Sequence, residues 1–202
     1  EAGFMLLSLG VAIAYGGNDI VPLGLSTGIT MMVGLTLRFF KRRQRITQID
    51  PKLGFMIVAM IWLVMSVFGA LPYFLGGYTQ SYFDAFFESM SGFSTTSATI
   101  ITNVEALPNG ILFWRSLTNW IGGVGIVVIV ISFIPFFGGG GMSLFAAEVT
   151  GPNKGKLSPH IKTTGKIIVA IYVSLTLIAA LCLWIGGMTP FDAVCHAFAT
   201  LS

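Results

Sequence analysis

Charged residues are scarce in this chain of 202 residues, where Asp, Glu, Lys and Arg together make up 9%. Soluble domains carry roughly 25% charged residues, and a folded chain of this size exposes a large surface to its solvent. With 54% hydrophobic residues, the composition excludes a water-soluble globular domain. It predicts an integral membrane protein of the all-α class.

Cysteine and histidine are nearly absent as well. Cys182 and Cys195 both lie among apolar neighbours, and we interpret them as small hydrophobic residues rather than a disulfide pair. His196 has no second metal-ligand type three or four residues further on. We therefore interpret it as a packed residue and not as a metal ligand.

Long uncharged runs are what the chain has instead. A helix that crosses a bilayer needs about 20 mostly apolar residues. About five segments fit, the first only as the end of a span: residues 2–18, 20–37, 53–75, 116–135 and 167–187. Because the chain begins and ends inside such patterns, we expect it to be part of a longer protein.

The basic residues orient these spans. Ten of the eleven Lys and Arg residues lie in two connections, six at positions 38–52 and four at positions 154–166. The positive-inside rule places both connections in the cytoplasm. A basic stretch such as residues 41–45 also fits nucleic acid or acidic lipid, but we interpret it as a topology marker and expect no nucleic-acid partner.

The outer connection between the third and fourth spans is unusual. Residues 89–104 are uncharged, and eight of these 16 residues are Ser or Thr. An aromatic segment at 82–90 precedes them, with Ser81 and Asp84 spaced as a helix N-cap box. We predict a short helix followed by extended chain. Either the segment re-enters the membrane, where protein or a water-filled cavity must satisfy its backbone, or it is a polar outer loop.

An internal repeat favours re-entry. The pattern Gly-Gly, five residues, Phe-Asp-Ala ends at Ala85, and Gly-Gly, three residues, Phe-Asp-Ala ends at Ala193. Each copy follows a long apolar run, and Thr189 and Pro190 predict a second capped helix. The predicted unit is span, pore helix, polar strand, span. One copy is complete and the second is truncated.

With these residues in view, a family resemblance can be stated. Residues 84–99 (DAFFESMSGFSTTSAT) resemble the first pore loop of the Trk-type potassium uptake proteins, and residues 120–126 (WIGGVGI) resemble the start of the following helix. Residues 148–159 and 188–193 resemble the linker and the second repeat. The resemblance implies repeated span, pore helix and span units like those of a potassium channel. It divides the chain into four domain-like parts: an N-terminal helix pair with a basic loop (1–52), a first repeat (53–137), a cytoplasmic linker (138–166) and a truncated second repeat (167–202).

The resemblance also implies a selectivity filter at Thr95, Thr96, Ser97 and Ala98, where carbonyl oxygens of Thr95 and Thr96 are the expected potassium ligands. Potassium-selective members of the family have glycine at position 97. Serine there puts strict potassium selectivity in doubt, because glycine permits backbone angles that other residues resist. Either potassium or sodium is therefore an expected substrate.

Five further charged residues have expected roles. Asp84 and Asp192 cap the two short helices, concentrate cations at the outer mouth, or do both. Glu88 or Glu105 pairs with Arg115, which is the outer cation available to them. We expect this pair to be a structural contact.

The resemblance implies monovalent cation transport in the inner membrane by a multi-pass, non-enzymatic protein with no cofactor of its own. Family partners are membrane lipid, a second copy of the protein, and a cytosolic nucleotide-binding regulatory subunit. The sequence leaves open whether transport is channel-like or an ion-coupled symport. The alternative is a secondary transporter with broken helices around a midplane site; an intramembrane enzyme and an assembly subunit fit the sequence less well.

Overall fold

The computed structural model describes residues 1–40, 51–137 and 157–202, and every regular element in these ranges is helical. The prediction of an all-α chain is confirmed in this part of the protein. The elements are α1 (Ala2–Tyr15), α2 (Ile20–Phe40), α3 (Pro51–Gly69), α4 (Leu71–Leu75), α5 (Tyr82–Phe93), the 3₁₀ turn η1 (Val104–Ala106), α6 (Asn109–Phe137), α8 (Leu157–Ile185) and α9 (Pro190–Leu201).

Three of the described segments are long and apolar enough to cross a bilayer: residues 20–39, 56–75 and 165–185. The third predicted span is divided between α3 and α4. The fourth predicted span lies in α6, which is not among these three segments; this helix begins before the uncharged run, at Asn109, and carries Arg115. The predicted linker lies outside the described residues up to position 156, as do basic residues 41–45.

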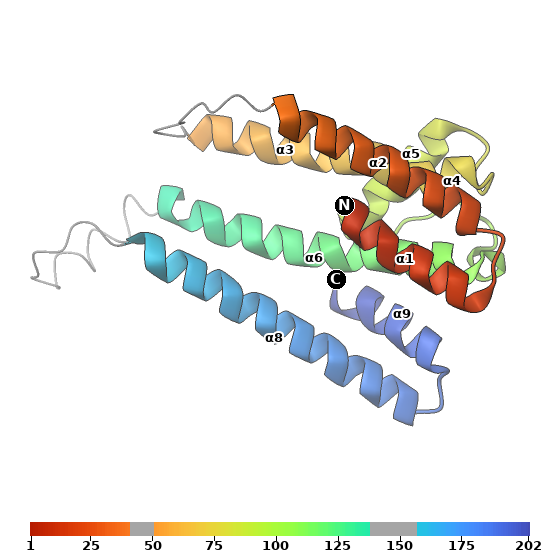
Figure 1. The fold of residues 1–202 in the computed structure, drawn as a ribbon. Coiled ribbons are helices and arrows are strands. Elements are labelled where there is room, and N and C mark those ends of the chain that lie inside the picture. Colours follow the sequence, from red (N-terminus) through yellow and green to blue (C-terminus); the bar gives the residue numbers. More distant parts are fainter. Residues whose placement is uncertain (41–50, 138–156) are drawn as a thin grey trace, which may run out of the picture.

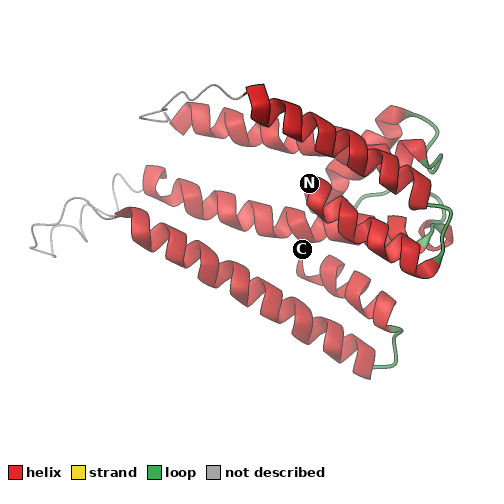
Figure 2. Ribbon diagram, viewed as in Figure 1, coloured by secondary structure: helices red, strands yellow, loops and turns green. Residues whose placement is uncertain are grey.

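The long helices run side by side, and the short helices fill the space at one end (Figure 1). Helix α5 packs against α3 and α6, α9 packs against α6 and α8, and α1 packs against α2 and α6. The connections among α3, α5 and α6 lie at the same end as the α1–α2 turn (Figure 2). Helix α6 thus lies at the centre of the packing, in contact with α1, α2, α3, α5, α8 and α9.

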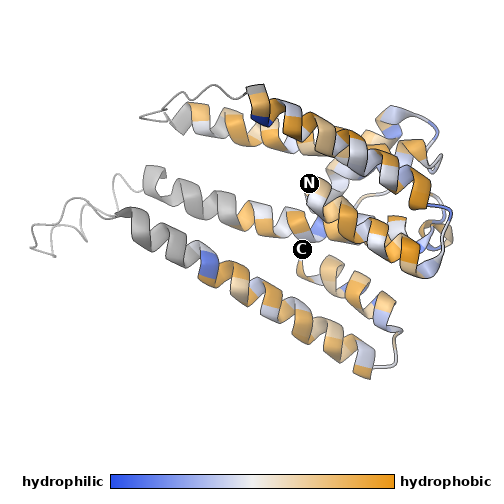
Figure 3. Cartoon of the chain, viewed as in Figure 1, coloured by the Kyte–Doolittle hydropathy of each residue, from blue (hydrophilic) through white to orange (hydrophobic). Residues whose placement is uncertain are grey.

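The buried core lies around the end of α5. Trp114 of α6 is fully buried, donates its indole N–H to the Gly69 carbonyl at 3.1 Å, and meets Phe93 edge-on with ring centroids 6.3 Å apart. Away from this core, apolar residues run along the long helices (Figure 3), and Leu177 and Ile185 of α8 are among the exposed ones. Such exposed apolar faces are expected for helices whose solvent is lipid.

Candidate functional site

Helix α5 begins at a complete capping box. The Ser81 hydroxyl accepts the Asp84 backbone N–H at 3.1 Å, and the Asp84 carboxylate accepts the Ser81 backbone N–H at 3.0 Å. These bonds satisfy two donors that a helix start leaves free. The Asp84 side chain is half-buried and is occupied by this cap.

Helix α9 is preceded by the same local structure as α5, a glycine turn and an N-cap. Gly77 precedes α5 with φ of 69°, and Gly187 precedes α9 with φ of 101°, a region that glycine enters without steric cost. The Thr189 hydroxyl accepts the Asp192 backbone N–H at 3.2 Å and donates to the Asp192 carboxylate at 2.7 Å. The two stretches that share a sequence pattern therefore share a turn and a capped helix of 12 residues.

The C-terminal ends of both short helices meet the middle of α6. A β-carbon on Gly122 would clash with the Phe93 carbonyl at the end of α5. One on Gly123 would lie 3.1 Å from the Cα atom of Ser202, at the end of α9. Two adjacent glycines of one long helix thus lie against the negative dipole ends of two short helices.

The chain that leaves α5 has an unusual backbone. Ser94 has φ of −81°, Thr95 has φ of 59° and Ser97 has φ of 56°. Thr95 and Ser97 are the non-glycine residues with positive φ in the described part of the chain. Such residues are uncommon, and they cluster where a structure needs strained geometry for function.

The N–H groups of this segment all face the end of α5. Thr95 donates to the Gly92 carbonyl at 2.9 Å, and Thr96 and Ser97 donate to the Ser91 carbonyl at 3.0 and 3.3 Å. A trans peptide unit holds its carbonyl opposite its N–H. The carbonyl oxygens of Ser94, Thr95 and Thr96 therefore point away from α5, and within the described ranges those of Thr95 and Thr96 accept no hydrogen bond.

Ala98 is oriented the other way. Its carbonyl accepts the Ser91 hydroxyl at 2.7 Å, which turns it back toward α5. Among positions 95–98, Thr95 and Thr96 have carbonyls that point away from α5, because the N–H groups of the residues that follow them donate to α5.

Glu88 holds the segment that follows. Its buried carboxylate accepts the Thr99 hydroxyl and the backbone N–H groups of Ile100 at 2.7 Å and Ile101 at 3.4 Å. The second carboxylate oxygen lies 3.6 Å from the Arg115 side chain. Of the two carboxylates that the sequence offers to Arg115, Glu88 is the one within ion-pair distance.

Ser97 is held from α6 as well. Its hydroxyl donates to the Asn119 side-chain oxygen at 3.1 Å, and Asn119 is 2% exposed. Sequence analysis did not identify Asn119, because it lies 22 residues from Ser97 and has no motif of its own.

Asp19 is a second residue that sequence analysis missed. Its carboxylate is fully buried and accepts the Ile111 backbone N–H at 3.1 Å in the first turn of α6. Burial, and then the Asp19 charge, raise the pKa of Tyr78 above its usual value. Asp19 ties the α1–α2 turn to the helix that carries Arg115 and Asn119.

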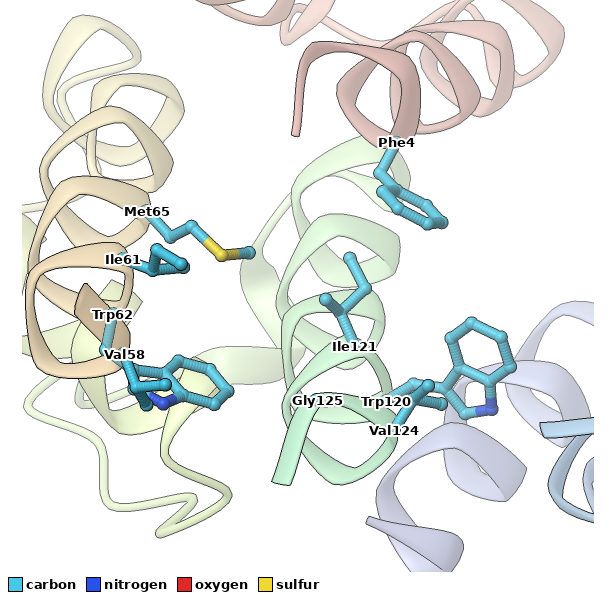
Figure 4. Close-up of a pocket in the computed structure, with 9 residues that line it drawn as sticks. All are labelled: Phe4, Val58, Ile61, Trp62, Met65, Trp120, Ile121, Val124 and Gly125. Carbon is cyan, nitrogen blue, oxygen red and sulfur yellow. The ribbon is translucent and has the colours of Figure 1, made fainter. Parts of the chain in front are cut away.

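Two of the pockets in the described part of the chain lie against α6. One of about 350 Å³ is lined wholly by apolar side chains of α3 and α6 with Phe4 of α1 at its edge (Figure 4). The other, of about 690 Å³, lies between α6 and α9 and is lined by Arg115, Asp192 and His196 among others. No group of three potential His, Cys, Asp or Glu metal ligands occurs in the residues that the structure describes.

Residues 25–202 match a family model described as cation transport protein TrkH. The Trk system potassium uptake protein TrkH of Vibrio parahaemolyticus is 39% identical over 200 residues, which are 98% of this chain and 41% of that protein. TrkH of Escherichia coli is 41% identical over 176 residues, covering 86% of this chain and 36% of that protein.

The fold is also similar to a solved structure. The crystal structure of the potassium transporter TrkH from Vibrio parahaemolyticus matches with a TM-score of 0.82 and 35% identity, over 98% of this chain and 39% of that one. The chain therefore spans about two-fifths of the length of the relatives it matches.

Proposed function

The chain belongs to the TrkH family of cation transport proteins, and from that premise we propose that the full-length protein moves monovalent cations, potassium first and sodium also, through a pore. It is a multi-pass protein of the inner membrane. The relatives named above are potassium uptake proteins, and we propose the same substrate class here.

The observation that most directly supports this proposal is the direction of the carbonyl groups at Thr95 and Thr96. Both point away from α5, because the next residues' N–H groups donate to Ser91. Unpaired carbonyl oxygens replace the water around a potassium ion in selectivity filters. We assign the ion ligands of this repeat to these two carbonyls, and the Ser91 bond gives Ala98 a supporting role.

The short helices supply the electrostatics of the proposed pore. Helices α5 and α9 end beside Gly122 and Gly123, near the middle of α6. A helix C-terminus carries about half a negative charge, so two such ends at one depth favour a cation there. Asp84 and Asp192, at the opposite ends of these helices, act first as caps and add negative charge at the outer mouth.

The proposed architecture is a repeated span, pore helix and span. Residues 53–137 form the complete unit and residues 167–202 the truncated one, preceded by the helix pair of residues 1–52 and joined by the linker of 138–166. This chain supplies one full pore unit and part of a second, and we do not expect it to conduct alone. Membrane lipid, a second copy of the protein and a cytosolic nucleotide-binding subunit are the proposed partners.

The test is cation uptake by the full-length protein in cells that lack other potassium uptake systems. We expect rubidium uptake above that of cells with an empty vector, and sodium uptake that is lower but present. Uptake of neither ion by correctly inserted protein, with its regulatory subunit present, would contradict the proposal. Rubidium uptake that requires a sodium or proton gradient would instead favour ion-coupled symport over a channel-like pore.

A further inference from the structure

Position 97 is fixed by two different helices. Its backbone N–H donates to the Ser91 carbonyl of α5 at 3.3 Å, and its side-chain hydroxyl donates to Asn119 of α6 at 3.1 Å. The residue has φ of 56°, where a side chain is disfavoured. A contact to the side chain is therefore part of what holds this backbone in place.

Asn119 is itself fixed. It is 2% exposed, and its amide nitrogen lies 3.4 Å from the Arg115 carbonyl one turn earlier in α6. The neighbouring Thr118 packs so closely against Gly92 of α5 that a β-carbon on Gly92 would clash with the Thr118 hydroxyl. The Asn119 amide thus reaches Ser97 from a rigid, closely packed part of α6.

A glycine or alanine at position 97 would have no hydroxyl to offer. The Asn119 side-chain oxygen would then remain buried without the partner it has here, which costs more than an ordinary hydrogen bond contributes. The Ser97 hydroxyl and the buried Asn119 oxygen therefore satisfy each other's need for a hydrogen-bond partner.

We propose that Asn119 is a positioning residue for the filter, and that it sets ion selectivity through its hydrogen bond to Ser97. Asn119 does not contact the ion. It fixes the backbone angles at position 97 and so the carbonyl of Thr96, which belongs to the adjoining peptide unit. This inference rests on the proposed function in assuming that Thr95 and Thr96 ligate the cation.

The test is a double-mutant cycle in the full-length protein, with the ratio of rubidium to sodium uptake as the readout. Ser97→Ala removes the hydroxyl but keeps the β-carbon, and Asn119→Ala removes the acceptor. We expect each single change to shift the ratio by about fivefold, comparable to one net hydrogen bond, and the double change to shift it no further than either single change. Asn119→Asp keeps an acceptor oxygen, so Ser97→Ala should still change the ratio in that background.

Thr118→Ala is the matched control. Thr118 is buried beside Asn119 and its hydroxyl donates to the Arg115 carbonyl at 2.7 Å, a hydrogen bond that does not involve Ser97. Its effect on the ratio should therefore add to that of Ser97→Ala. Asn119→Leu, which keeps the branched shape without polar atoms, replaces Asn119→Ala if the smaller side chain prevents folding, as judged by size-exclusion chromatography.

The outcomes separate the two proposals. Additive effects of positions 97 and 119 in a wild-type protein that transports rubidium would overturn the role of Asn119 and leave the proposed function intact. An unchanged ratio in Asn119→Ala and Asn119→Leu would do the same. Absence of any uptake by the wild-type protein would overturn the proposed function, and the role of Asn119 with it.

Discussion

Asp19 accepts a hydrogen bond from the backbone N–H of Ile111 at 3.1 Å, although 92 residues separate them. The carboxylate is fully buried at the N-terminal end of α6, where the helix dipole favours a negative charge. It therefore fixes α6 to the N-terminal helix pair. The position of Asn119 and Arg115 depends on the same helix.

We predict that Asp19→Ala lowers the free energy of unfolding by about 1–2 kcal/mol, the usual effect of losing a helix cap. Asp19→Asn should cost less, because its amide oxygen still accepts the N–H group. The measurement is the midpoint of thermal unfolding of the purified full-length protein in detergent. Asn18→Ala is the control, since Asn18 is exposed in the same turn; an equal loss there would contradict the role of Asp19.

The same contact shows what sequence analysis could and could not predict. The helix caps at Ser81 and Thr189 and the turns at Gly77 and Gly187 depend on residues a few positions apart, so their patterns are visible in the sequence. The early start of α6 was missed because an uncharged run does not mark where a helix begins. Its stabilising partner, Asp19, is distant in sequence.

The site was predictable to the same extent. Residues 95–98 could be proposed from the hydroxyl-rich stretch and its resemblance to a family, but the direction of each carbonyl depends on bonds to Ser91. Charge alone allowed both Glu88 and Glu105 as partners of Arg115. Only the packing of α5 on α6 brings Glu88 within 3.6 Å.

We predict that folding depends on Glu88, because its carboxylate accepts hydrogen bonds from the segment after the filter in addition to pairing with Arg115. Glu88→Ala would leave Arg115 without its buried partner and would free the N–H groups of Ile100 and Ile101. Breaking a buried pair costs about 3–5 kcal/mol, so we expect little folded protein in detergent extracts. Glu88→Gln keeps one acceptor oxygen and should fold with reduced thermal stability.

The control for Glu88 is Glu105→Gln. Glu105 is exposed, and exposed substitutions usually change stability by less than about 0.5 kcal/mol. Folded yield that falls equally for both variants would show that outer negative charge matters rather than the contacts of Glu88.

Ser97→Gly is predicted to change selectivity without a large change in stability. Glycine relieves the disfavoured φ of 56°, worth about 1–2 kcal/mol. It also leaves the buried Asn119 oxygen without the Ser97 hydroxyl, which costs about 1–3 kcal/mol, so the two effects largely offset each other. Ser94→Gly is the matched control, because Ser94 has φ of −81° and gains no such relief. We expect it to destabilise the protein by about 0.5–1 kcal/mol.

Uptake assays on Ser97→Gly distinguish two roles for the serine. A higher ratio of rubidium to sodium uptake places the control of selectivity at position 97. An unchanged ratio, with thermal stability also unchanged, would show that this filter tolerates serine.

Gly122→Ala and Gly123→Ala test whether the ends of α5 and α9 need close contact with α6. A β-carbon at Gly122 meets the Phe93 carbonyl, which is backbone and cannot rotate aside, whereas at Gly123 it meets the flexible Tyr172 hydroxyl first. Overpacking costs about 1–3 kcal/mol, so Gly122→Ala should lower the unfolding midpoint more than Gly123→Ala. Gly165→Ala is the control: it lies in α8 with open space around it, and alanine there should raise stability by about 0.5–1 kcal/mol. If Gly122→Ala is as stable as Gly165→Ala, α5 does not rest on the middle of α6, and the proposed position of its dipole is wrong.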